Sequence, residues 1–155
     1  MLKVVKIVIT GCSGYVPSEY EYKDRLIVTD HSAEYDCKPY KPWEMNPVQK
    51  WSYTTNSLAF RKLFELAVRA VDEIFVRDPQ CPGTDMPVTG FEVFFENGDY
   101  TEKTYMVRPD EFSACFAILK KMVPNCELIP WTLQTSEDYH VKRVWHEILE
   151  YEADR

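Results

Sequence analysis

The spacing of apolar and polar residues divides the chain into strand-like and helix-like segments. Residues 2–10 are rich in β-branched side chains and are apolar on both faces, which predicts a strand inside a sheet. Further strands are predicted at 25–29, 33–37, 49–54, 89–96 and 99–107. Turn-forming residues separate two pairs of these segments, and Asn97-Gly98 predicts a hairpin with a tight type I′ turn.

Apolar residues that recur every three to four positions predict three amphipathic helices. Their apolar stripes span residues 60–75, 112–123 and 141–149. Asn56 or Ser57 can cap the first helix, because a short side-chain oxygen accepts from free N–H groups of the first turn. Pro109 opens the second helix at a position where its missing N–H does no harm.

This order of elements predicts an α+β fold. Strands joined by short turns form an antiparallel sheet, here of about five to six strands, and three one-sided helices pack mainly on one of its faces. A chain of 155 residues with 45% hydrophobic content can bury a core as a single domain over 1–155. Residues 1–56 form its strand-rich half, with a proline- and aromatic-rich loop at 38–47, and residues 57–155 hold a helix, a hairpin and two further helices.

The charge of the chain is unevenly distributed. The net charge is −7, yet residues 1–50 hold seven basic and seven acidic residues, so the whole acidic excess lies from residue 51 onward. A negative field disfavours nucleic acid and favours a basic protein partner. No segment is long and apolar enough to span a membrane, and the apolar stretch of residues 1–10 contains two lysines, unlike a secretory signal. The five cysteines show no paired spacing. We therefore expect a cytoplasmic protein with reduced thiols.

The candidate motifs for catalysis, metals and cofactors each have a structural explanation as well. The segment Thr10-Gly11-Cys12-Ser13-Gly14 locally resembles a dinucleotide-binding loop, but Pro17 stands where that motif needs a third glycine. A glycine turn is the favoured interpretation, and no cofactor is expected. Cys12 is a weak nucleophile candidate, with His31, His140 or His146 as its base. Two helical His/Glu pairs, at 137/140 and at 146/150, lack further ligands, so no metal site is predicted.

Aromatic side chains alternate with lysines between residues 35 and 53. The candidate anchors of a binding surface are Tyr40, Trp43, Trp51 and Tyr53. Such residues serve equally as core and edge packing, as hot spots of a protein interface, or as stacking platforms for single-stranded nucleic acid. Three alternatives therefore stay open for this segment, and prolines at 39, 42 and 47 would keep its backbone rigid in each.

Four segments carry a family resemblance: KDRLIVT (23–29), KWSYTTNS (50–57), KKMVPNCE (120–127) and TSEDY (135–139). In this order they resemble a widespread family of small uncharacterised proteins of gut anaerobic bacteria and their mobile elements. The resemblance spans roughly residues 20–140 and implies a bacterial intracellular protein. It assigns no activity and no catalytic residues.

The leading functional hypothesis is a non-enzymatic, intracellular protein-binding module. Its specific form is an inhibitor encoded by a mobile element, which blocks a basic nucleic-acid-binding host protein in the manner of an anti-CRISPR. Acidic residues of the last helix, Glu147 and Glu150, would steer such a partner. The alternatives are a small enzyme that uses Cys12 or a histidine, and a nucleic-acid-binding module that uses residues 35–53. The oligomeric state is left open.

Overall fold

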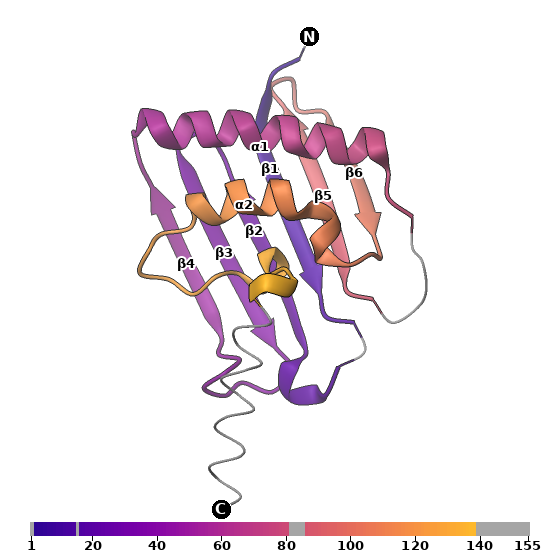
Figure 1. Cartoon of the computed structure of the whole chain (residues 1–155). Helices are drawn as coiled ribbons and strands as arrows, with labels where there is room; N and C mark the ends of the chain where they lie inside the picture. Colours follow the sequence, from indigo (N-terminus) through magenta and orange to yellow (C-terminus); the bar gives the residue numbers. More distant parts are fainter. Residues whose placement is uncertain (1, 15, 81–85, 139–155) are drawn as a thin grey trace, which may run out of the picture.

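The computed structural model describes residues 2–14, 16–80 and 86–138, and within them the α+β prediction is confirmed. Six strands form one antiparallel sheet in the order β4-β3-β2-β1-β5-β6 (Figure 1). Their bounds are β1 Val4–Cys12, β2 Tyr22–Val28, β3 Ser32–Pro39, β4 Gln49–Thr54, β5 Val88–Phe95 and β6 Tyr100–Tyr105. The apolar first strand lies inside the sheet, between β2 and β5, as its pattern predicts.

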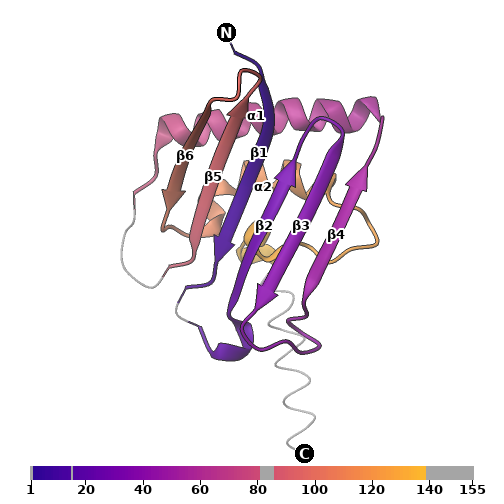
Figure 2. The same cartoon turned by 180° about the vertical axis from the view of Figure 1, so that it is seen from behind.

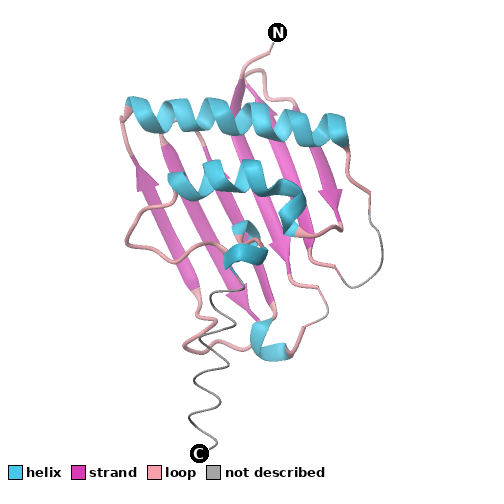
Figure 3. Cartoon of the chain, viewed as in Figure 1, coloured by secondary structure: helices cyan, strands magenta, loops and turns pink. Residues whose placement is uncertain are grey.

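Two α-helices cover one face of the sheet. α1 (Leu58–Arg77) and α2 (Ser113–Met122) lie side by side across that face (Figures 1 and 3). Three short 3-10 turns complete the described elements: η1 Ser18–Tyr20, η2 Pro109–Phe112 and η3 Trp131–Leu133. None of the helices in the described ranges is both long and apolar enough to cross a bilayer. The third predicted helix, over 141–149, lies outside the described residues.

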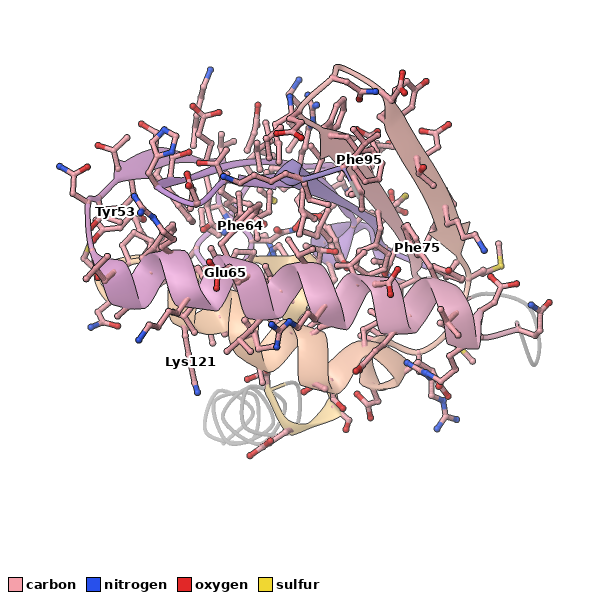
Figure 4. All side chains as sticks on the ribbon, turned by 90° about the horizontal axis from the view of Figure 1, so that it is seen from above. Tyr53, Phe64, Glu65, Phe75, Phe95 and Lys121 are labelled. Atoms are coloured by element: carbon pink, nitrogen blue, oxygen red, sulfur yellow. The ribbon has the colours of Figure 1, made fainter. Side chains whose placement is uncertain are left out.

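The core lies between the helices and the sheet. Figure 4 shows Phe64 and Phe75 of α1 directed toward the sheet, whereas Lys121 of α2 points away from it. Phe91 of β5 is fully buried, and its ring centroid lies 5.1 to 6.4 Å from four other aromatic rings: Phe75, Tyr105, Phe112 and Phe116. This aromatic cluster joins α1, β5, β6 and α2 into one packed unit.

The other face of the sheet has no described element packed on it, and Figure 2 shows the molecule from that side. Antiparallel sheets can leave one face to water, and the alternation of buried and accessible residues in β2 and β3 fits this arrangement, whereas Val8 of the central strand β1 is fully buried on this face. We call this surface the open face. Its side chains alternate with the core residues, and the charged ones are Lys6, Lys23, Arg25, Glu34, Asp36, Lys38, Lys50, Glu92 and Glu102.

The hairpin between β5 and β6 is confirmed, but its turn differs from the predicted type I′. A type I′ turn needs a positive φ at both central residues, whereas Gly98 has φ 90° and Asn97 does not have a positive φ. Phe95 accepts a hydrogen bond from Gly98 N–H (3.0 Å) and donates its own N–H to Asp99 O (2.9 Å). The loop is one residue longer than predicted, so only the glycine occupies the left-handed region.

Candidate functional site

The four aromatic residues predicted as anchors lie in two different environments. Trp51 and Tyr53 of β4 sit on the helix-covered side, where their rings pack 5.7 Å from Tyr35 and 6.1 Å from Phe60. Figure 4 shows Tyr53 at the edge of the sheet, near the start of α1. These two residues therefore take part in packing between β4 and its neighbours, although Tyr53 remains 39% exposed. Tyr40 and Trp43 instead lie in the connection between β3 and β4.

This connection forms an exposed apolar surface, which we call the apolar loop (residues 40–48). Four large apolar side chains are accessible within these nine positions: Tyr40 (67% exposed), Trp43 (38%), Met45 (36%) and Val48 (64%). Scattered apolar residues are normal on a protein surface, but a group this dense on one short segment is typical of an interaction site.

Asn46 holds the apolar loop in place, although the loop itself is at the surface. Its side chain is fully buried, and its amide N–H groups donate to the carbonyls of Glu19 and Glu21, each at 3.1 Å. Its Oδ1 accepts from Trp131 Nε1 at 3.0 Å. Its backbone also exchanges two hydrogen bonds with Trp43, at 2.9 and 3.2 Å. The loop is thus connected to both the β1–β2 connection and η3.

Trp43 is oriented by contacts of its own. Its indole N–H donates to the Glu19 carbonyl at 2.8 Å, and its ring meets Tyr20 edge-on at 6.0 Å. An aromatic side chain that is both accessible and fixed loses little conformational entropy when a partner binds it. The sequence signal for this geometry is only the density of prolines. Nothing in the sequence marks Asn46 as the residue that fixes the loop.

Cys12, the weak nucleophile candidate, ends β1 and is half-buried. Its Sγ donates to the Ser13 carbonyl at 3.6 Å, and it lines a shallow hollow of ≈ 370 Å³ with Lys23, Lys38 and Tyr40. His31 lies at the opposite end of the sheet, in the turn between β2 and β3, where its Nδ1 meets Asp30 at 2.7 Å. Of the candidate bases, His31 is therefore not brought to Cys12, and His140 and His146 lie outside the described residues.

A buried polar network beneath η3 was not predicted from the sequence. Asp24 of β2 is 5% exposed, and its Oδ2 accepts from Tyr35 Oη at 2.7 Å and from the Thr132 N–H at 2.9 Å. Tyr35 Oη in turn accepts from the Trp131 N–H at 3.2 Å. Loss of solvent raises the pKa of Asp24 to about 6, against the opposing effect of these hydrogen bonds. The same cause raises the pKa of the neighbouring Cys37 thiol to about 11.

Gly11 leaves the space that this network occupies. A Cβ at Gly11 would overlap Asp24 Oδ1 and lie 2.7 Å from Thr132 Oγ1. Within the described structure, neither of those two oxygens has a hydrogen-bond partner. Gly11 is therefore required for the close approach of η3 to β1 and β2.

Gly11→Ala is expected to lower the free energy of unfolding by about 1–3 kcal/mol, because β1 or η3 must shift to admit the methyl group. Urea unfolding followed by circular dichroism measures the change. An alanine variant with a midpoint equal to that of the wild type would show that this region is not tightly packed.

Two further expectations from the sequence concern metal ligands and the acidic contacts of a partner. No set of three or more His, Cys, Asp or Glu side chains that could hold a metal ion occurs among the residues the structure describes. Glu147 and Glu150, the predicted acidic contacts, lie outside them. We find no protein-family model that matches the chain and no curated protein with significant similarity to it.

Proposed function

We propose that this protein is a binding module that docks on a partner protein through its apolar loop, residues 40–48. The observation that carries the proposal is the attachment of the loop through Asn46, a fully buried residue within an exposed segment. Tryptophan and tyrosine are enriched among the hot spots of protein interfaces, and the loop exposes one of each, with Trp43 held in place by its own contacts. The partner surface that complements them is a concave apolar pocket with a polar rim.

The intracellular inhibitor hypothesis is a narrower form of this proposal. It requires a basic partner and the acidic residues Glu147 and Glu150. Both glutamates lie outside the residues that the structure describes. The apolar loop supports the broader function without them, because its anchors are uncharged. A partner with a cationic groove and an apolar pocket beside it would satisfy both ideas, and this narrower role stays a prediction.

The proposal is tested by placing a photoreactive amino acid at Val48 and, as a matched control, at Val76. Both valines are highly exposed, at 64% and 81%, but Val76 lies on α1, away from the apolar loop. Irradiation in the native host is expected to yield one discrete adduct from position 48 and none from position 76. Mass spectrometry then identifies the partner.

Substitution of an exposed anchor measures how much the apolar loop contributes to the binding affinity. With the identified partner, Tyr40→Ala is expected to weaken binding by about 10- to 100-fold, which corresponds to a hot spot of about 1.4–2.8 kcal/mol. Leu58→Ala, at a residue 69% exposed on α1, is the control and is expected to leave the affinity unchanged. Equal crosslinking from positions 48 and 76, or no adduct from either, would contradict a specific docking role for the loop.

A further inference from the structure

Two pairs of like charges face each other directly on the open face. Lys23 of β2 is the cross-strand partner of Lys38 of β3, and Glu92 of β5 is the partner of Glu102 of β6. Like charges in this relation destabilise a sheet. Within the described ranges, none of the four forms an ion pair with another residue. The open face therefore carries two uncompensated charges of opposite sign, the basic pair and the acidic pair.

The neighbouring charges do not neutralise these pairs. Asp36 lies between Arg25 and Lys50 across β2, β3 and β4. Its single carboxylate therefore has two other cations as direct neighbours, in addition to the basic pair. Lys6 is the basic residue nearest in register to the acidic pair, but its Nζ lies over the ring of Phe94, 4.2 Å from the centroid. The arrangement decreases the stability of the isolated sheet, and such local conflicts are typical of binding sites.

We propose that the open face binds the open face of a second copy of this chain, with the basic pair of each copy opposite the acidic pair of the other. A two-fold axis that relates the two copies produces this arrangement, because the basic pair of each copy then meets the acidic pair of the other and each contact occurs twice. The proposal concerns a different surface from the apolar loop and does not depend on it.

The register of the sheet fits such a dimer. The midpoints of the two pairs are three strand spacings apart across the sheet, about 14 Å. They are four residues apart along β1, from Cys12 opposite Lys23 to Val8 opposite Glu92, about 13 Å. The line that joins them thus runs at about 45° to the strands. A two-fold axis that exchanges its ends makes the strands of the two copies cross near 90°, one of the two common packings of stacked sheets.

The centre of this interface combines small side chains on β1 and β5 with Arg25 of β2, the cross-strand partner of Thr10. Thr10 lies midway between the basic and acidic pairs on β1, and its partner on β5 is Gly90. A Cβ at Gly90 would overlap Thr10 Oγ1 and would lie 3.7 Å from Thr104 Oγ1, so two threonine side chains border the space above β5 at this point. Two copies can therefore approach closely over β1 and β5, whereas Arg25 of β2 and Glu34 of β3, which lie beside the axis, extend into the interface.

The dimer is expected to be weak and sensitive to salt. Crossed sheets of this size overlap over roughly 20 Å by 20 Å, which places the interface in the class of transient contacts. Glu34 lies close to the proposed axis, where it meets Glu34 of the other copy, and this repulsion opposes association. Single-stranded nucleic acid suits this face less, because the exposed aromatic side chain of β6, Tyr100, stands beside the acidic pair.

Sedimentation equilibrium of the full chain tests the proposal. At about 20 mM salt the weight-average mass is expected to rise with concentration from 18.3 kDa toward twice that value, and at about 500 mM salt to stay at 18.3 kDa. The double variants Lys23→Glu/Lys38→Glu and Glu92→Lys/Glu102→Lys should each be monomeric, because the two charge pairs on the open face then have the same sign. Their equimolar mixture should form a heterodimer. Glu34→Gln should tighten the wild-type dimer.

The matched control is Lys62→Glu/Arg69→Glu, which makes the same change in net charge as Lys23→Glu/Lys38→Glu but on the exposed side of α1. It should associate as the wild type does, and circular dichroism verifies that every variant is folded. A wild-type chain that is monomeric at low salt, or reversed variants that fail to associate when mixed, overturns the proposal. So does a monomer that binds a single-stranded oligonucleotide through the basic pair, since that result assigns the face to nucleic acid.

Discussion

Phe91→Ala is expected to lower the free energy of unfolding by about 3–5 kcal/mol, the range for a large aromatic residue removed from a packed core. Phe91 is fully buried and contacts aromatic rings from α1, β6, η2 and α2, so the cavity cannot be filled by a single neighbour. For a chain of this length, such a loss corresponds to a fall in Tm of roughly 6–20 °C. Differential scanning calorimetry measures it.

Phe94→Ala is the matched control, because it removes the same side chain from the other face of β5. Phe94 is half-buried and stacks on Tyr100 at 5.5 Å, with Lys6 above its ring. Its loss is expected to cost about 1 kcal/mol, since the site is already partly hydrated. Equal effects of the two substitutions would contradict the assignment of one buried and one open face to this strand.

Acidification from pH 7.5 to pH 5.0 is expected to stabilise the protein, by about 1–1.5 kcal/mol, through Asp24 alone. The pKa of its carboxyl is about 6 in the folded chain, against 3.8 for an aspartate side chain in water, because burial disfavours the charged form. A raised carboxyl pKa means that the folded state binds more protons between these two values. The stability contributed by Asp24 is fully present below pH 3.8 and is lost as the pH rises through 6.

Measurements above pH 5 separate the effect of Asp24 from the effects of carboxyls that destabilise the protein on acidification. Among the residues that the structure describes, three other carboxyls, Asp30, Asp110 and Asp138, have lowered pKa values. Their contributions are present above pH 3.8 and are lost as the pH falls through the folded pKa, so they act mainly at more acidic values. Urea unfolding at steps between pH 5.0 and 7.5 therefore reports chiefly on Asp24.

Asp24→Asn isolates the ionisation from the hydrogen bonds. Asparagine is neutral at every pH, and its side-chain oxygen can accept from Tyr35 Oη and the Thr132 N–H as the carboxylate does. We expect a flat stability profile between pH 5.0 and 7.5, and a gain of up to about 3 kcal/mol at pH 7.5. Asp24→Ala should instead destabilise at both pH values, because it leaves two buried donors without an acceptor. A wild-type slope that persists in the asparagine variant would contradict the assignment to Asp24.

Local pattern was sufficient to predict most of the elements. The apolar stripe of α1 ends before Pro79, and the observed helix ends at Arg77, with Asp78 in the left-handed conformation as its C-cap. The residue pair Asn97-Gly98 located the β5–β6 hairpin, although the turn type depended on a loop length that the residues alone do not determine. The alternation in Trp51-Ser52-Tyr53 places both aromatic residues on one face. Which face α1 covers is a tertiary property.

The polar parts of the structure could not be predicted in the same way. Trp131 and Leu133 have no periodic neighbours, so η3 gave no signal, and the burial of Asp24 depends on that turn. Asn46 reads as an ordinary turn residue before Pro47. The like-charge pairs on the open face become visible only once the register of β2 with β3, and of β5 with β6, is known. Each of these features is a contact between segments, which a linear pattern does not encode.

The position of β1 has a consequence for synthesis of the chain on the ribosome. β1 to β4 can pair as soon as they emerge, but the second edge of β1 is completed by β5, whose first residue, Val88, is made long after Cys12. At typical rates of translation this interval lasts roughly 5–15 s, during which Ile7 and Ile9 border an unpaired edge. Such an edge is a template for wrong pairing with other nascent chains. Newly made protein should therefore require a chaperone until β5 docks, whereas the finished sheet should not.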